Sequence, residues 1–234
     1  AERDKLSPDE IIALMKRGNE RFLSGKGSQQ DVLAQQRASA KGQFPATVIL
    51  SCIDSRAPAE TIMDLGIGDA FNARLAGNVA NNDILGSMEF GCKVASSKII
   101  VVLGHTKCGA VRGACDHVEM GNLTALLSKI QPAVYDEKTE TENRNSGNDE
   151  FVEKVSTINV KRTVHAIIER SPIIKEMIEA GEIEIIGGIH DITTGAVSFY
   201  DDTLLIGSLA FQADVKPHYS HSQAHPREPI EGQI

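Results

Sequence analysis

Three short, mostly apolar runs stand out along the chain, at residues 46–50, 98–103 and 184–189. They are rich in Val and Ile and do not alternate with polar residues, which is typical of parallel strands buried on both faces. Segments with the helical spacing of apolar positions lie between them, at 59–65, 82–95, 110–118, 123–134 and 151–170. Strands that alternate with helices predict an α/β fold, with a central, mostly parallel β-sheet flanked by helices.

The two ends of this pattern predict a helix and a hairpin. Ser7, Pro8 and Glu10 supply a hydroxyl cap, a first-turn proline and a capping-box glutamate, so we expect a helix from there to about Leu23. This N-terminal helical arm has one apolar face, which must pack on its own domain or on a partner subunit. Near the other end, the turn residues 193–195 predict a strand at 196–200 that would add an antiparallel edge to the sheet.

Length and composition favour a single domain over residues 1–234, divided into the arm (1–40), the core (41–205) and a C-terminal extension (206–234). The net charge of -8 argues against nucleic acid or an anionic membrane as a partner. No apolar run approaches the roughly 18 residues of a membrane span. We expect a cytoplasmic protein by default, or a periplasmic one if Ala1 is left by signal-peptide cleavage.

Two polar motifs directly follow the first two apolar runs. Cys52-Ile53-Asp54-Ser55-Arg56 comes after residues 46–50, and Gly104-His105-Thr106-Lys107-Cys108-Gly109 comes after residues 98–103. The carboxyl ends of parallel strands meet at one edge of a sheet, so Cys52, His105 and Cys108 are expected to lie together. Two thiolates and one imidazole suit zinc, and three protein ligands leave the fourth position that distinguishes a catalytic site from a structural one.

Asp54 and Arg56 determine what happens at that fourth position. The Asp54 carboxylate can bind the metal itself as a fourth ligand in a closed form, or accept a hydrogen bond from a metal-bound water. Arg56 is placed to form a two-point pair with Asp54, which would hold the carboxylate off the zinc. The other two cysteines, Cys92 and Cys115, fall in predicted helices and are expected to be core residues.

At these residues the chain resembles a known family, the β-class carbonic anhydrases. The family's C-x-D-S-R box is similar to residues 52–56, and its G-H-[ST]-x-C-G-[AG] box is similar to residues 104–110. Between them, residues 70–78 (AFNARLAGN) are similar to the family's F-x-x-R-N-A-G-N stretch, and residues 86–90 to its following helix. The two boxes together are specific, whereas either one alone would be weaker evidence.

The resemblance implies reversible hydration of carbon dioxide to bicarbonate and a proton, with one zinc ion per chain on Cys52, His105 and Cys108. Zinc lowers the pKa of its bound water to about 7, so zinc-bound hydroxide would attack the carbon. Asp54 would orient the hydroxide, and Arg56 would orient Asp54. Members of the family form homodimers or homotetramers, with the active site at the subunit interface and the N-terminal helices laid across the partner.

The resemblance also assigns three residues to the substrate. Gln43, nine residues before Cys52, matches a glutamine that faces bicarbonate in type I members, and Phe71 matches an apolar pocket residue. The alternatives are an exposed loop glutamine and a core aromatic. The backbone N–H of Gly109 would donate a hydrogen bond to a substrate oxygen.

The chain departs from the family pattern at two points. Leu75 stands where the family usually has asparagine, which puts the polar contacts of that loop in doubt. The chain has no Trp, so we do not expect the second bicarbonate site of the type II members in its usual form.

Other functions stay open on the sequence alone. The same scaffold supports hydrolysis of carbon disulfide or carbonyl sulfide, and a non-catalytic zinc or bicarbonate-binding protein would keep Asp54 on the metal. A nucleotide-binding protein is disfavoured because neither G-x-G-x-x-G nor G-x-x-x-x-G-K-[ST] occurs. The remaining histidines considered match no motif and are expected to be structural (His165, His190) or solvated (His218, His221, His225).

Overall fold

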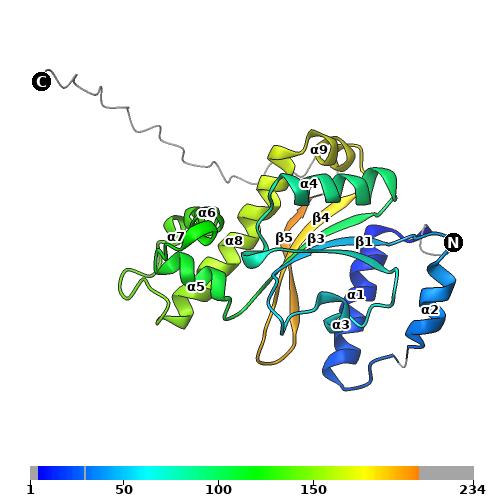
Figure 1. Ribbon diagram of the computed structural model, residues 1–234, viewed down its shortest axis with the longest axis horizontal. Helices are drawn as coiled ribbons and strands as arrows, with labels where there is room; N and C mark the ends of the chain where they lie inside the picture. Colours follow the sequence, from blue (N-terminus) through cyan, green and yellow to red (C-terminus); the bar gives the residue numbers. More distant parts are fainter. Residues whose placement is uncertain (1–4, 29, 206–234) are drawn as a thin grey trace, which may run out of the picture.

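A five-stranded sheet with helices on both faces forms the centre of the protein (Figure 1). This computed structural model describes residues 5–28 and 30–205, so the predicted extension and its three histidines lie outside the described residues. The strand order is β2-β1-β3-β4-β5, with β5 antiparallel to β4 and the other pairs parallel. The strands are β1 (Thr47–Ser51), β2 (Ala70–Arg74), β3 (Ile99–His105), β4 (Glu184–His190) and β5 (Val197–Leu205). The predicted α/β fold with an antiparallel edge is confirmed.

The strands differ in how clearly the sequence signals them. β1 and β3 are buried along their whole length, as their continuous apolar runs predict. β2 is absent from those runs because Asn72 and Arg74 interrupt its apolar residues. It lies at one edge of the sheet, where a strand has a neighbour on one side and does not need to be uniformly apolar.

The helices that the sequence predicts occur in the predicted order, but one of them is divided and α2 was not predicted. The prediction of one helix at 123–134 is wrong, because this segment forms two helices, α6 and α7. Pro132 lacks the N–H that a helix interior needs, so it fits only the first turn of α7. A short helix that the sequence pattern does not indicate, α2, buries none of its side chains. The α-helices are α1 (Pro8–Leu23), α2 (Val32–Ser39), α3 (Ala59–Ile62), α4 (Asn82–Glu89), α5 (Gly109–Cys115), α6 (Gly121–Leu127), α7 (Gln131–Asp136), α8 (Asp149–Arg170) and α9 (Pro172–Glu179).

Two less common helical segments also occur in the described part of the chain. A 3-10 turn, η2 (Ala76–Asn78), follows β2, and a π-helical turn, η3 (Phe90–Val94), continues α4. Among the described residues, none of the helices combines the length and the apolar character that a membrane span requires.

The helices cover the two faces of the sheet in separate layers (Figure 1). α1 and α3 lie on one face, where Ile11 and Met15 pack against Ile49, Val101 and Ile186. On the opposite face, a second apolar cluster joins the strands to α4, α8 and α9. The buried face of the N-terminal helix therefore packs on the sheet of its own chain.

An acidic, polar loop joins α7 to α8 at residues 137–148, and it is more firmly held than its composition indicates. The Glu137 side chain is only 2% exposed, and it accepts hydrogen bonds from Thr139 and from Arg144. The Arg144 guanidinium lies 4.6 Å from the centre of the Phe151 ring. A partly buried ion pair thus orders a loop whose composition is acidic and polar.

Two helical glycines give a matched test of this packing. A Cβ atom on Gly18 of α1 would lie 1.9 Å from the Met63 backbone oxygen, whereas one on Gly86 of α4 would meet nothing within 4 Å. We expect Gly18→Ala to lower the free energy of unfolding by about 2–3 kcal/mol through overpacking. Gly86→Ala should raise it by up to about 1 kcal/mol, because alanine favours the helix. Urea unfolding of both variants measures this, and equal effects would contradict the close approach of α1 to Met63.

Candidate metal centre

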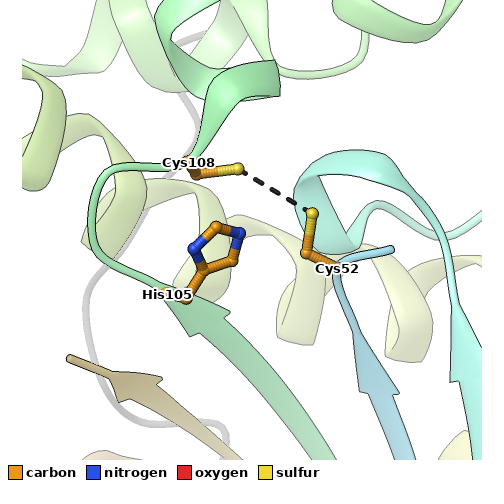
Figure 2. A group of neighbouring side chains, drawn as sticks. All are labelled: Cys52, His105 and Cys108. Carbon is orange, nitrogen blue, oxygen red and sulfur yellow. Dashed lines mark hydrogen bonds between the residues drawn. The ribbon is translucent and has the colours of Figure 1, made fainter. Parts of the chain in front are cut away.

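Three side chains meet at the carboxyl edge of the sheet (Figure 2). Cys52 directly follows β1, His105 is the last residue of β3, and Cys108 precedes α5. Their ligand atoms all lie within 4.8 Å of one another, with the two sulfur atoms 4.0 Å apart. All three residues are buried. The sequence prediction that the two polar motifs converge is therefore confirmed in its geometry.

The His105 ring is oriented for binding a metal through Nε2. Its Nδ1 lies 2.9 Å from the Thr106 carbonyl oxygen, so Nδ1 carries the proton and Nε2 presents its lone pair. The Nε2 atom is buried, and no hydrogen-bond partner for it occurs in the described structure. A buried acceptor without a partner is costly, so this atom fits a cation between it and the two sulfurs.

The electrostatics of the two thiols also favour a cation. The pKa of Cys52 is lowered, mainly because the Cys108 thiol donates a hydrogen bond to it, and Gly77 N–H lies 3.3 Å from the same sulfur. The pKa of Cys108 is raised, because Cys52 holds its proton and burial disfavours a second charge. Two buried thiolates at 4.0 Å need a positive charge between them. The donor set of two sulfurs and one nitrogen fits zinc.

Asp54 is held beside this cluster by Arg56, as the sequence predicts. The guanidinium donates from Nε to Oδ1 at 2.9 Å and from Nη2 to Oδ2 at 2.7 Å, and the Arg56 backbone N–H also donates to Oδ1. These bonds from Arg56 keep the pKa of Asp54 well below its usual range. Oδ2 lies 3.8 Å from His105 Nε2, so the carboxylate borders the site while remaining paired with Arg56.

Arg74 holds the same loop through its backbone oxygens, a role that the sequence motifs did not predict. It ends β2, opposite Ser51 in the parallel register. Its guanidinium donates to the carbonyl oxygens of Cys52 at 3.0 Å and Asp54 at 2.6 Å. An arginine at the end of a strand that pairs with the cysteine-bearing strand is the signal that could have identified it.

A second contact that the motif analysis missed comes from α8. Asn159, which is 2% exposed, donates to the Gly77 carbonyl oxygen at 2.8 Å. Gly77 has a φ of 68°, which favours glycine, and this conformation lets its N–H face the Cys52 sulfur. Asn159 thereby supports a donor to a metal-binding sulfur from a distant part of the chain.

The substrate residues assigned by resemblance are distributed differently. Gly109 is the first residue of α5, beside Cys108, and borders the cluster. Gln43 is exposed and precedes β1, so the five residues of that strand, roughly 16 Å, separate it from Cys52. Phe71 pairs with Val48 near the same far end and packs edge-on against the Phe90 ring, 6.0 Å between centres. One chain thus does not bring Gln43 and Phe71 to the metal centre, and their roles stay predictions.

The remaining candidates do not belong to the Cys52-His105-Cys108 group. Leu75, at the position where the family usually has asparagine, packs against the apolar cluster that contains Cys52 and Cys108. Cys92 and Cys115 are buried and unpaired, as expected for core cysteines. His190 is buried beside His105 in the sheet, and burial lowers its pKa.

The ligand set can be tested by counting zinc. Cys52→Ser and Cys108→Ser each remove one sulfur donor, and we expect both variants to lose zinc during dialysis against a chelator. Cys115→Ala is the control, because Cys115 belongs to the same apolar cluster but not to the ligand set. Atomic absorption should find about one zinc per chain in the control and in the unmodified protein. Zinc retained by both serine variants would contradict the assignment.

Comparisons with known proteins agree with this geometry. The family model described as carbonic anhydrase matches residues 47–197. Carbonic anhydrase 2 of Mycobacterium tuberculosis is 35% identical over 199 residues, covering 82% of this chain and 93% of that protein. Carbonic anhydrase of Mycolicibacterium smegmatis is 32% identical over 189 residues, covering 78% of this chain and 88% of that protein.

Solved structures show the same likeness. A β-carbonic anhydrase of Aspergillus fumigatus has a TM-score of 0.63 at 27% identity, covering 82% of this chain and 91% of that one. One of two tetrameric β-carbonic anhydrases from Sordaria macrospora has a TM-score of 0.62 at 26% identity, covering 72% and 89%. With the family model, the curated relatives and the buried Cys-His-Cys cluster in agreement, this chain belongs to the β-carbonic anhydrase family.

Proposed function

We propose that the protein catalyses the reversible hydration of carbon dioxide to bicarbonate and a proton, with zinc held by Cys52, His105 and Cys108. The observation that carries this proposal is the buried cluster of three donor atoms beside an aspartate that is already paired with an arginine. When bound there, zinc acts as a Lewis acid that lowers the pKa of a water in its fourth position to about 7. The names of the relatives support the same reaction.

Asp54 orients the attacking water in this account. Its pKa lies far below neutrality, so the carboxylate stays ionised and can only accept hydrogen bonds at working pH. By accepting the O–H of the water, Asp54 turns the oxygen lone pair toward the substrate carbon. The two-point pair with Arg56 fixes the carboxylate for this task and keeps it from binding the metal.

The surroundings of the cluster suit a small apolar substrate. Val79, Leu75 and Ala110 pack in the same apolar cluster as Cys52 and Cys108, and carbon dioxide has no charge to solvate. The backbone N–H of Gly109, in the first turn of α5, is assigned to a substrate oxygen. Bicarbonate would gain from such a donor as negative charge develops on its oxygens.

A second copy of the chain is needed to complete the site, in a homodimer or a homotetramer. Gln43 and Phe71 lie at the far end of β1 and β2 from their own cluster, so they can line a metal centre only if it belongs to another subunit. Apolar side chains next to them are exposed in the single chain: Phe44 is 55% and Phe90 48% exposed. Their exposure supports an interface on this side of the sheet.

Stopped-flow hydration of carbon dioxide from about pH 6.5 to 9 tests the reaction. We expect the zinc-loaded protein to be active at pH 7, because Asp54 is held off the metal. Arg56→Ala frees Asp54 to occupy the fourth position, so activity at pH 7 should fall about 100-fold and recover in part above about pH 8, where hydroxide competes with the carboxylate. Arg56→Lys keeps the positive charge but loses the two-point pairing, so its activity at pH 7 should lie between those of the unmodified protein and Arg56→Ala.

Two outcomes of that experiment would contradict the proposal. An inactive protein with about one zinc bound per chain would exclude carbon dioxide hydration and favour a sulfur analogue as substrate or a binding function. An Arg56→Ala variant whose activity falls equally at every pH would exclude the role given to Arg56.

Mixing two inactive variants tests whether the site is shared. Gln43→Ala retains its own metal ligands, and Cys52→Ser retains Gln43. If Gln43 acts across the interface, dimers formed from both chains contain one intact site, and an equimolar mixture should recover about a quarter of full activity. The mixture is unfolded and refolded together to exchange subunits. No recovery above the sum of the separate variants, with mixed dimers present, would place Gln43 outside the partner's site.

A further inference from the structure

The side chain of Asn19 joins the N-terminal helix to two other segments. Asn19 lies in α1 and is 5% exposed. Its Nδ2 donates to the carbonyl oxygens of Ile62 at 3.1 Å and Gly195 at 2.9 Å, and its Oδ1 accepts from Val197 N–H at 2.9 Å. A single buried amide therefore connects α1 to the end of α3 and to the turn between β4 and β5.

The turn leads directly to a metal ligand. It holds Ile192, whose N–H donates to Thr106 Oγ1 at 3.0 Å, while Thr106 N–H donates to the His190 carbonyl oxygen at 2.9 Å. The Thr106 carbonyl oxygen in turn accepts from His105 Nδ1. The position of the turn thus determines where Thr106 lies, and Thr106 determines how the His105 ring is oriented.

The second connection leads to the other ligand-bearing loop. Ile62 ends α3, and its N–H donates to the Pro58 carbonyl oxygen at 3.1 Å. Pro58 lies just after the Cys52–Arg56 loop, in which Ala57 N–H donates to the Asp54 carbonyl oxygen at 3.0 Å. Asn19 therefore binds the end of α3, which follows the Cys52–Arg56 loop, and the turn that contacts Thr106 beside His105.

α1 cannot shift easily relative to these contacts. Arg21 Nε lies 2.5 Å from Asp64 Oδ2, and the same carboxylate accepts from Ser28. On the turn side, Gly195 has a φ of 83°, and a Cβ atom there would lie 2.9 Å from the Phe22 ring. The helix, the end of α3 and the turn thus form one tightly packed unit around Asn19.

We infer that Asn19 is a positioning residue for the metal centre. Through its hydrogen bonds to the turn and to the end of α3, Asn19 sets the orientation of His105 and the spacing of the two loops that carry the ligands. The inference rests on the proposed zinc site, because it concerns how tightly that site holds its metal. Loss of the amide should weaken zinc binding even though Asn19 touches no ligand. In metal sites generally, outer hydrogen-bond partners of this kind change affinity by about 10–100-fold.

The test is zinc affinity, measured by competition with a chromophoric chelator, together with the visible spectrum of the cobalt-substituted protein. Asn19→Ala should raise the dissociation constant for zinc about tenfold and change the cobalt spectrum, because the ligand geometry relaxes. Met15→Ala is the matched control. Met15 is fully buried in the same helix, and its replacement by Ala removes apolar packing from the same face. Among the described contacts, Met15 makes no hydrogen bond to the turn.

Thr106→Val supplies a second, independent variant if Asn19→Ala fails to fold. It removes the hydroxyl that accepts from Ile192 and so interrupts the connection nearer to His105. In the double variant, Asn19→Ala should weaken zinc binding by less than it does alone, because the connection to His105 is already cut.

The outcomes separate this inference from the proposed function. Failure of the unmodified protein to bind zinc would overturn the proposed site itself. Normal binding in the unmodified protein, with equal dissociation constants in Asn19→Ala and Met15→Ala or with fully additive effects of Asn19→Ala and Thr106→Val, would overturn the positioning role alone. A selective change in Asn19→Ala, reduced in the Thr106→Val background, supports it.

Discussion

Two buried sulfur atoms and one imidazole nitrogen, all within 4.8 Å, make an arrangement that favours a positive charge between them. One thiol can ionise with the help of the other, as the opposed pKa shifts of Cys52 and Cys108 indicate, but burial disfavours a second negative charge unless a cation lies beside it. Arg56 cannot serve, because its guanidinium is committed to Asp54. A bound metal ion would resolve this conflict, and in the proposed function that ion keeps one position free.

The fold holds these donors mainly through hydrogen bonds that involve backbone groups. The Thr106 carbonyl orients the His105 ring, and the Gly77 N–H faces the Cys52 sulfur. Arg74 binds two backbone oxygens of the loop that carries Cys52 and Asp54. Because each of these groups lies on a different element, the centre depends on the packing of the whole sheet, and on α1 through Asn19.

The ligands were predictable from sequence because their chemistry and their position coincide. Cys52 and His105 come directly after or at the end of continuous apolar strands, and parallel strands bring their carboxyl ends together. Asn19 and Asn159 gave no such signal, because an amide in a helix looks like a solvent-facing residue until the tertiary contact is known. β2 was not predicted because polar residues such as Arg74 interrupt its apolar run. The break between α6 and α7 was not predicted because it depends on Pro132 alone. Gln43 and Phe71 could be assigned only by resemblance, since the fold places them at the far end of β1 and β2 from the metal centre of their own chain.

The central claim is that Arg56 keeps Asp54 off the metal at neutral pH, so that the fourth position stays open for the reaction. A crystal structure of the zinc-loaded protein at pH 7 tests this claim most directly. We predict zinc on Cys52, His105 and Cys108, a fourth position open to solvent, and Asp54 still paired with both nitrogens of Arg56. An Asp54 carboxylate bound to the zinc, with the Arg56 pair broken, would contradict it.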